Sequence, residues 1–398
     1  NELIQRDKIK VIYLYMHFVS LHKFLITTAL IIVMLAGGMR HADAQGQYPE
    51  IRFPYPFPME LQIPSDDTLE ICVLGDVMMH TKQIENARID DSRYDFSSYF
   101  QFIEDDIRGA DMAVANMEFT LAGKPYTGYP CFSAPDSLAR YLAECGFDVF
   151  LTANNHIYDK GTAGVARTMK IYRELEEEYG ISIAGVTGDD VSGDAAFPLI
   201  LNTKGISVAF VNITYGTNLG IGPYGPKVYR LSDRQAIEEA MAKAEECDVT
   251  IVLPHWGEEY KLSHNARQEE VAKWLISLGA DLIIGAHPHV IQDCVKTDGV
   301  TVAYSLGNAV SNMSAKNTQL ELMAKVRIVR HLNGRIEVAE PEFRYLWCSR
   351  PGGYNSSYTV LPVKDFIGTR EQWQGPWEYD KMMRTYRHVQ EKTRITEQ

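Results

Sequence analysis

The sequence lacks the signatures of several common enzyme classes. Its 398 residues contain no G-x-S-x-G nucleophile elbow, no Walker phosphate-binding loop, no Cys-x-x-Cys pair and no internal repeat. Serine hydrolases and nucleoside triphosphatases are therefore disfavoured. Positive charge is scarce: 39 Lys and Arg stand against 52 Asp and Glu, the formal net charge is −13, and no basic stripe occurs. We expect no nucleic acid partner.

The N-terminal region has the features of a targeting segment. Residues 24–38 are almost uniformly apolar, Lys23 precedes them, and Ala42-Asp43-Ala44 forms an A-x-A cleavage site. A helix of about 15 residues spans about 22 Å, short of the ~30 Å hydrocarbon core, which favours a signal peptide over a membrane span. We expect residues 1–44 to be a signal peptide with an upstream extension. The mature chain would be exported to the periplasm, the cell envelope or the medium, with no permanent membrane span.

Six cysteines are spread over the chain, at positions 72, 131, 145, 247, 294 and 348. Export permits disulfides between them. Cys72, however, lies inside an apolar, strand-like run, and buried thiols that pack as small hydrophobic groups are an equally good interpretation. The sequence leaves both alternatives open.

The rest of the chain predicts an α/β domain. Residues 45–68 are rich in proline and predict an extended lead-in. From residue 69 on, strand-like runs alternate with helical patterns, which is typical of helices outside a mostly parallel sheet. The expected strands cover residues 69–74, 112–115, 149–152, 199–202, 208–213, 249–253, 282–284 and 300–304.

Two helices have recognisable ends. Residues 161–179 carry one apolar face, and Gly180 can end that helix. Residues 265–278 begin with Asn265 and Gln268 at the spacing of a capping box. Both helices support the alternating architecture.

The C-terminal part is less regular. Residues 320–346 predict two further strands around the turn at Asn333-Gly334. Beyond them the pattern fades, apart from a helix expected near residues 378–392. We expect a main domain over residues 69–346 and a C-terminal extension over residues 347–398.

Polar side chains follow five of the expected strands, at the point where each strand ends. In parallel α/β sheets these carboxyl ends face one edge, where ligands bind. Each residue alone has a structural alternative, such as a helix cap or a turn. Five strand ends with ligand-type side chains predict convergence on one site. The metal candidates are Asp76, Glu118, Asn155, His255, His287 and His289.

The chemistry of this set predicts a metal site. Carboxylate, amide and imidazole groups without a thiolate suit hard or borderline cations. We expect one or two divalent ions, of Zn, Mn or Fe. Paired cations about 4 Å apart can activate a water and stabilise developing charge at a phosphoryl or acyl centre.

The same residues carry a resemblance to a known family. The segments GDVMMH, ANME, TANNHIYDKG, PHWGEEY, GAHPHVIQ and YSLGN occur in this order between about residues 69 and 312. They resemble the CapA family of poly-γ-glutamate capsule proteins, which is similar to the calcineurin-like metallophosphoesterases. The resemblance implies a four-layer αββα sandwich of the metallo-dependent phosphatase type. It also implies a cell-envelope protein that acts in the synthesis, export or anchoring of poly-γ-glutamate or a related anionic polymer.

The resemblance also implies roles for individual residues. Asp76 matches the first metal aspartate of the phosphoesterases, Asn155 the metal-bound asparagine, and His255, His287 and His289 the later metal histidines. His156 matches the histidine that protonates or steadies the leaving group. With Asp159 three residues further, it forms the pair of catalytic candidates.

Two positions depart from the phosphoesterase pattern. Met78 stands where the histidine of Asp-x-His is usual, and His80 is a candidate replacement. Asn116 and Glu118 stand in place of the Gly-Asp-x-x-Asp motif. These departures bear on whether a second metal ion is bound and on whether the protein has phosphatase activity.

Other candidates for metal or substrate contact are Asn154, Tyr215, Glu258 and Asn308. Glu258 either orients His255 or belongs to a solvated acidic turn. Asn308 has a structural interpretation as a turn residue. Residues 220–225 match G-x-G-x-x-G literally, but Pro223 opposes an immediate helix, so a loop is favoured over a dinucleotide site.

Two functional hypotheses follow. The first is an exported metal-dependent hydrolase or transferase that acts on an anionic polymer. The second is a non-catalytic accessory protein that uses the same cleft to grip polymer carboxylates, together with the envelope export machinery. Met78 favours the second, and His156 with the histidine set favours the first. A purely structural envelope protein would not need converging polar strand ends.

Overall fold

The computed structural model describes residues 66–187, 197–220 and 225–397. The expected signal peptide, nearly all of the proline-rich lead-in and most of the motif at 220–225 lie outside the described residues. Among the described residues, no helix combines the length and apolar character needed to cross a bilayer.

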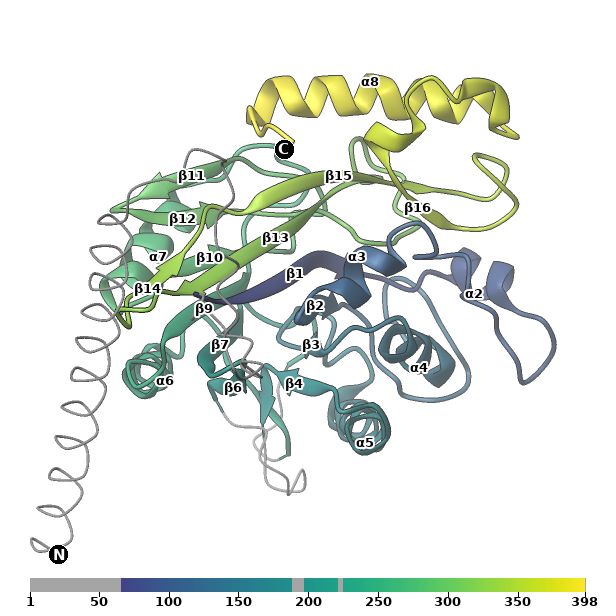
Figure 1. Ribbon diagram of the computed structural model, residues 1–398. Helices are drawn as coiled ribbons and strands as arrows, with labels where there is room; N and C mark the ends of the chain where they lie inside the picture. Colours follow the sequence, from purple (N-terminus) through teal and green to yellow (C-terminus); the bar gives the residue numbers. More distant parts are fainter. Residues whose placement is uncertain (1–65, 188–196, 221–224, 398) are drawn as a thin grey trace, which may run out of the picture. The chain divides into compact units, whose positions relative to one another are not determined.

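Two large β-sheets form the centre of the fold (Figure 1). Within the described residues the first sheet has eight strands, in the order β16-β15-β13-β1-β2-β3-β4, with β14 paired to β13. Strands β1 to β4 are parallel, and β13 to β16 pair with their neighbours in antiparallel fashion. Their bounds are β1 Asp67–Val77, β2 Met112–Met117, β3 Val149–Leu151, β4 Ser182–Ala184, β13 Leu320–Arg330, β14 Ile336–Val338, β15 Glu342–Ser349 and β16 Thr359–Pro362.

The second sheet runs in the order β11-β12-β10-β9-β7-β6, and its strands β7, β9, β10 and β12 are parallel. A separate small ladder joins β5 to β8. The bounds are β5 Val186–Thr187, β6 Leu199–Thr203, β7 Ile206–Thr214, β8 Lys227–Val228, β9 Val249–His255, β10 Leu282–Ile284, β11 Cys294–Thr297 and β12 Val300–Ala303.

Helices cover the outer face of each sheet. The side of the first sheet carries α3, α4 and α5, and the side of the second carries α6 and α7 (Figure 1). Short helices connect the remaining parts, and the last long helix, α8, packs beside β13 and β15. The bounds are α2 Thr81–Ala87, α3 Glu104–Gly109, α4 Asp136–Glu144, α5 Gly161–Tyr179, α6 Arg234–Ala244, α7 Ala266–Ser277, η1 Val363–Phe366, η2 Arg370–Gln372 and α8 Pro376–Thr393.

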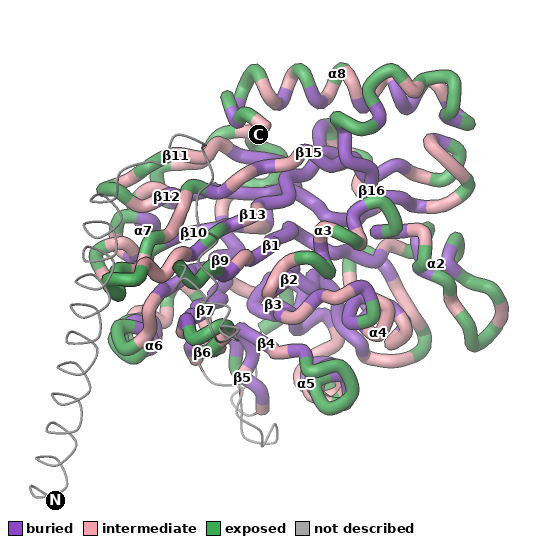
Figure 2. The backbone as a smooth tube through the Cα atoms, in the orientation of Figure 1, coloured by how far each residue is buried: buried purple, intermediate pink, exposed green. Residues whose placement is uncertain are grey.

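The side chains of β1 show how one strand serves two core layers. Ile71 and Val73 belong to the core between the sheets, and Cys72 and Leu74 belong to the core under the helices. This alternation follows from the period of two in a β-strand. Because both faces are covered, the strands β2, β3, β9 and β10 are buried along their whole length (Figure 2). The expected four-layer αββα arrangement is confirmed.

Both helices with recognisable ends form as expected. Helix α5 spans Gly161–Tyr179 and ends at Gly180, whose φ of 74° is the left-handed cap that glycine adopts readily. At the start of α7, the Gln268 backbone N–H donates to Asn265 Oδ1 at 2.9 Å, and the Asn265 N–H donates to Gln268 Oε1 at 3.1 Å. The reciprocal pair is the capping box that the sequence predicts.

The C-terminal part of the structure differs from the sequence prediction in its strands and in its domain boundary. Residues 320–349 form three strands rather than two, and the expected boundary at residue 347 falls inside β15. The tail is also part of the core, because Leu361, Trp373 and Met382 pack with residues between the sheets. The helix expected near residues 378–392 is confirmed as α8, and its buried apolar side chains recur at helical spacing, at Tyr379, Met382, Tyr386 and Val389.

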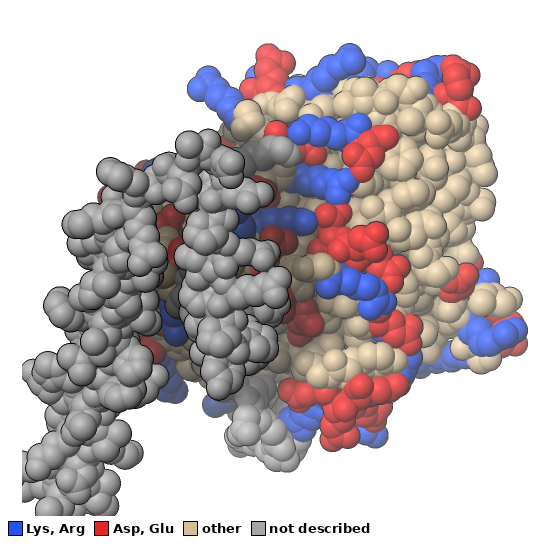
Figure 3. Space-filling view, in the orientation of Figure 1, with Lys and Arg blue, Asp and Glu red and all other residues tan. Residues whose placement is uncertain are grey.

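The surface carries charges of both signs. On the face shown in Figure 3, acidic and basic side chains are interspersed. All six cysteines are free, and Cys72, Cys145 and Cys348 are buried. The interpretation of buried, unpaired thiols therefore holds for these three, and no disulfide forms among the six.

Candidate metal centre

The six metal candidates come from both sheets and lie at one rim. Asp76 is the penultimate residue of β1, Glu118 directly follows β2, and His255 is the last residue of β9. We call Asp76, Glu118, Asn155, His255, His287 and His289 the ligand cluster.

The bridge between His255 and Ala286 lies within the second sheet and brings the segment that follows β10 alongside the end of β9. Contact between the two sheets at this rim is made by side chains. Asn116 of β2 donates from Nδ2 to Asp76 Oδ1 at 2.7 Å, and the same Nδ2 lies 3.3 Å from His255 Nδ1. The carboxyl ends of strands from both sheets therefore face one site.

His287 and His289 sit on a strained turn. Their φ angles are 98° and 58°, in the left-handed region that residues with a Cβ rarely adopt. The backbone N–H of His287 donates to Asp76 Oδ2 at 3.2 Å, which helps to hold the turn. Backbone strain of this kind costs on the order of 1–3 kcal/mol per residue and is concentrated at functional sites. The turn aims both imidazoles at the end of β1.

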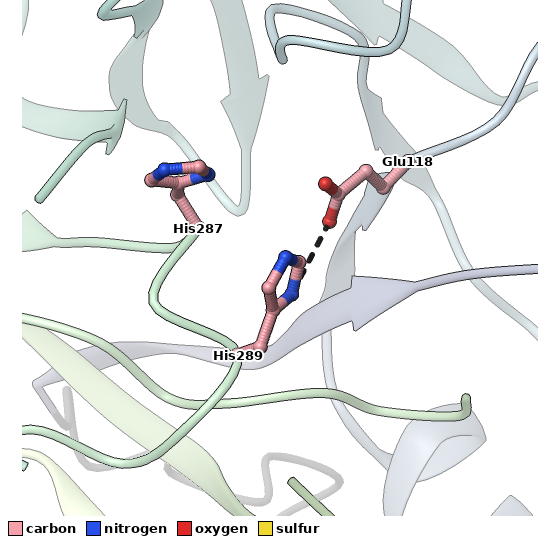
Figure 4. A group of neighbouring side chains, drawn as sticks. All are labelled: Glu118, His287 and His289. Carbon is pink, nitrogen blue, oxygen red and sulfur yellow. Dashed lines mark ion pairs between the residues drawn. The ribbon is translucent and has the colours of Figure 1, made fainter. Parts of the chain in front are cut away.

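Two overlapping triads lie within the ligand cluster. Glu118, His287 and His289 form one, and Asp76, Glu118 and His255 form the other; in each, three ligand atoms lie within 4.8 Å of one another. Figure 4 shows Glu118 and His289 directed toward each other, with an ion pair of 3.9 Å between Nδ1 and Oε2, and His287 nearby. Glu118 is common to both triads.

Glu118 is a buried carboxylate without a hydrogen-bond partner. Neither Oε1 nor Oε2 accepts a hydrogen bond, and Nδ1 of the buried His287 is likewise without a partner. Burial raises the pKa of Glu118 well above its usual range, and the charge of Asp76 adds to this effect. An unpaired buried polar group is costly. These atoms are therefore open to a ligand.

The histidines divide into two electrostatic classes. Burial lowers the pKa of His255 to about 3 and that of His287 well below its usual range. For His289, burial is outweighed by the hydrogen bond and charge of Asp76, and the pKa is raised. Burial of Asp76 is in turn outweighed by its bond to His289, which contributes to a pKa of about 2.

The ligand cluster fits a divalent cation. Neutral imidazoles and carboxylate oxygens are the atoms that Zn, Mn and Fe bind, and a cation would satisfy the orphaned atoms of Glu118 and His287. The metal expectation from the sequence is thus compatible with the structure, and the identity of the ion is left open by these ligands.

His156 is oriented by Asp159, as a pair. His156 Nδ1 lies 2.7 Å from Asp159 Oδ2, and its Nε2 lies 3.8 Å from Glu118 Oε1. The ring of Phe132 packs edge-on against the imidazole, with the centroids 4.7 Å apart. Asp159 Oδ2 also accepts the Phe132 backbone N–H at 2.7 Å. The arrangement directs Nε2 of His156 toward the ligand cluster.

Two asparagines of the third strand end differ in role. Asn155 Oδ1 lies 2.7 Å from His255 Nε2, within the ligand cluster. Asn154 points instead into the protein: its Nδ2 donates to Asn116 Oδ1 at 3.2 Å, and its Oδ1 accepts the His156 N–H at 3.1 Å. Asn116 and Asn154 therefore position other side chains of the site.

Asn308 positions His289. Its Oδ1 lies 2.9 Å from His289 Nδ1, and its Nδ2 donates to the Thr318 carbonyl at 3.1 Å. Such a partner fixes the orientation of an imidazole. Asn308 thus contacts one residue of the ligand cluster, His289, and holds its ring in place.

His80 and Glu258 do not join the ligand cluster. His80 is the N-cap residue of α2, where its Nδ1 lies 3.1 Å from Gln83 Oε1, and burial lowers its pKa to about 4. It belongs to neither triad. Glu258 has a side chain that is 62% exposed and pairs with Lys261 at 3.5 Å, so it does not orient His255. The solvated acidic turn is the correct interpretation.

Tyr215 lies at the mouth of the site. It follows β7, and its backbone N–H donates to the His255 carbonyl at 2.8 Å. The ring centroids of Tyr215 and His287 are 4.5 Å apart, yet the residue is 45% exposed. Tyr215 therefore covers one side of the His287 ring and is itself in contact with solvent.

The sequence interpretation missed Glu321. This residue of β13 accepts the Gly75 N–H on Oε1 at 2.7 Å, and its buried Oε2 has no partner. Burial raises its pKa well above the usual range, against the effect of the Gly75 hydrogen bond. The signal was a glutamate inside the buried run Leu320–Ala324, but its partner is 246 positions away.

Glu321→Gln should stabilise the protein by a margin that grows with pH. Below about pH 4.5, its usual pKa, both folded and unfolded states hold the proton and the substitution changes little. Above it, the unfolded state ionises first, so the wild type loses up to about 1.4 kcal/mol per pH unit until the folded carboxyl also ionises. Glutamine keeps the acceptor for Gly75. Urea unfolding of both proteins between pH 4.5 and 8.5 measures the difference.

The exposed Glu245→Gln is the matched control for that series, because Glu245 lies on the surface just after α6. Its unfolding curve should follow that of the wild type at every pH. Equal pH dependence in Glu321→Gln and the wild type would contradict the prediction.

Comparison with known proteins identifies the family. The family model described as "Bacterial capsule synthesis protein PGA_cap" matches residues 70–313, which is more than half of the 398 residues. The chain belongs to this family. The resemblance drawn from the sequence motifs is confirmed. The matched region contains the whole ligand cluster, whereas Glu321 and α8 lie beyond it.

Two curated relatives carry related names. The "Capsule biosynthesis protein CapA" of Bacillus anthracis is 29% identical over 269 residues, covering 64% of this chain and 62% of that protein. The match thus spans less than two thirds of the anthracis protein. The "PGA biosynthesis protein CapA" of Bacillus subtilis (strain 168) is 26% identical over 294 residues, covering 69% and 71%.

Among solved structures, the NAD nucleotidase (NadN) of Haemophilus influenzae is similar to this chain, with 12% sequence identity and a TM-score of 0.43. The similarity covers 81% of this chain and 63% of that one.

Proposed function

We propose that this capsule synthesis family member is a metal-dependent hydrolase or transferase that acts on an anionic envelope polymer, poly-γ-glutamate or a related one. The proposal depends mainly on one observation: the carboxylate of Glu118 is fully buried, has no hydrogen-bond partner and belongs to both triads. The names of the two CapA relatives, one of which refers to PGA biosynthesis, support the choice of polymer.

The residues proposed to hold the metal are the ligand cluster. Glu118 contributes to both triads, with Asp76 and His255 on one side and His287 and His289 on the other. Asn155 stands at 2.7 Å from His255 and adds an amide oxygen. A bound divalent ion would supply Lewis acidity, which polarises the bond to be cut and favours ionisation of a water.

His156 is proposed to handle the proton of the leaving group. Asp159 accepts from Nδ1 at 2.7 Å, which fixes the tautomer and leaves Nε2 facing Glu118 and the space in front of it. A general acid or base must be within reach of the reacting group and held in one orientation. Tyr215, over His287, restricts the access of water to that space.

An accessory role is the second candidate, because of Met78. This side chain is 1% exposed and apolar where a second ligand from the first strand would stand. In that role the same cluster would grip polymer carboxylates through an ion during export or attachment, without turnover. In both cases we propose an exported protein that works with the envelope machinery.

Metal analysis and turnover assays test the proposal together. The mature protein, purified without chelator, is expected to hold at least one equivalent of Zn, Mn or Fe by inductively coupled plasma mass spectrometry. It should hydrolyse a phosphoester or a γ-glutamyl oligomer, lose turnover on dialysis against chelator, and recover it when the same metal returns.

Each other outcome selects a different conclusion. Metal without turnover on either substrate class would overturn the enzyme in favour of the accessory role. Absence of metal after mild purification would overturn both roles.

A further inference from the structure

A pocket of about 280 Å³ lies beside the ligand cluster. It is formed between the end of β9, the start of α7 and the segment before α6, with Trp256 and Gly257, the two residues after His255, in its lining. This volume is close to the lower end, about 300 Å³, of the range for small-ligand sites, so the pocket suits one short unit of a polymer. No residue of the ligand cluster lines it.

Tyr215 connects this pocket to the cluster. It lines the pocket, and its ring lies 4.5 Å from the ring of His287 and 6.4 Å from that of His255, centroid to centroid. A chain that passes over Tyr215 would thus reach from the cluster into the pocket. The tyrosine is 45% exposed, so this path is open to solvent.

Arg267 is the one charged residue in the described lining of the pocket. Its partner Glu270, at 2.7 Å, is on the surface, and the two side chains are 57% and 63% exposed. An exposed ion pair of this kind is weak, so the guanidinium remains available to a second carboxylate. In a protein of net charge −13, a cation in the lining of this pocket is a suitable anchor for an anion.

The remaining lining suits a chain with apolar links between its charges. Trp256, Leu231 and Val271 supply apolar surface, and Ser232 supplies a hydroxyl. A γ-glutamyl unit has two methylene groups in its main chain and carries one free carboxylate. The methylenes match the apolar walls, and the carboxylate matches the bidentate geometry of arginine.

We propose that this pocket is a substrate subsite in which Arg267 binds a carboxylate of the polymer next to the unit held at the ligand cluster. The proposal rests on the proposed function, because it takes its polymer from there. Arg267 acts as a specificity-determining residue and takes no part in holding the metal.

Binding of two labelled probes to the full, metal-loaded protein tests the subsite. The first probe is a γ-glutamyl hexamer, and the second is the same hexamer with its free carboxylates converted to amides. We expect Arg267→Gln to weaken binding of the acidic hexamer at least about tenfold, as measured by fluorescence anisotropy, and to leave binding of the amide hexamer unchanged. Arg387→Gln, on the exposed side of α8, is the matched control and should bind both probes like the wild type.

Metal content and thermal unfolding of each variant are measured in parallel, so that a folding defect is recognised. If the wild type binds the acidic hexamer and Arg267→Gln binds it equally well, the subsite is overturned and the proposed function stands. If the metal-loaded wild type binds neither probe, the polymer of the proposed function is overturned, and the subsite with it.

Discussion

Glu118→Gln should make the metal-free protein more stable and at the same time weaken its metal binding by at least about 10–100-fold. The buried carboxylate has no hydrogen-bond partner on either oxygen, and burial raises its pKa well above the usual range. A neutral amide of the same shape does not ionise, so it removes the cost of burying an ionisable carboxyl, about 1.4 kcal/mol for each pH unit above its usual pKa until the folded carboxyl also ionises. It also removes the one ligand that both triads share.

The opposite signs of these two effects distinguish a ligand from a structural residue. Urea unfolding in chelator measures the stability, and isothermal titration with Zn or Mn measures the affinity. Glu258→Gln is the control, because this glutamate is 62% exposed and should change neither quantity. A less stable variant with unchanged metal affinity would show that Glu118 supports the fold instead.

His156→Ala should lower turnover by about 10²–10⁴-fold while the protein keeps its metal. His156 belongs to neither triad, and its Nε2 is directed at the cluster by the 2.7 Å contact between Nδ1 and Asp159. Asp159→Asn should have a smaller effect, since it leaves the imidazole in place and weakens only the contact that orients it. Steady-state kinetics of both variants on the same substrate measure the two effects.

The metal content of His156→Ala distinguishes loss of a catalytic group from loss of the metal site. His388→Ala, in α8, is the control and should keep both turnover and metal. Loss of bound metal in His156→Ala would place this histidine among the ligands. Full turnover with full metal would exclude it from the chemistry.

The sequence was sufficient for much of the fold. The eight strands expected between residues 69 and 304 form, and so do the two helices with recognisable ends, as the capping box of α7 illustrates. Such signals are local, so they can be recognised without knowing the neighbours. The short strands β4, β5, β8 and β11 were not predicted. The helix expected near residues 378–392 also forms, as α8, but its packing on β13 and β15 could not be predicted, because those strands belong to the main sheet.

The site was partly visible for the same reason. Parallel strands deliver their ends to one edge, so ligand-type residues at those ends, such as Asp76 and His255, could be expected to meet. Spacing could not show that Asn154 donates to Asn116 and that His80 caps α2. Both contacts depend on how the backbone turns after the strand.

By itself, the sequence determined which chemical groups stand at the strand ends and that they come together. Only the tertiary structure decided that Glu118 is buried without a hydrogen-bond partner and that Glu321 reaches Gly75 from a strand far along the chain. It also decided that Arg267 lines a pocket together with Tyr215. The physical reason is that burial and pairing depend on what other segments bring to the same place, and a local pattern carries no record of those segments.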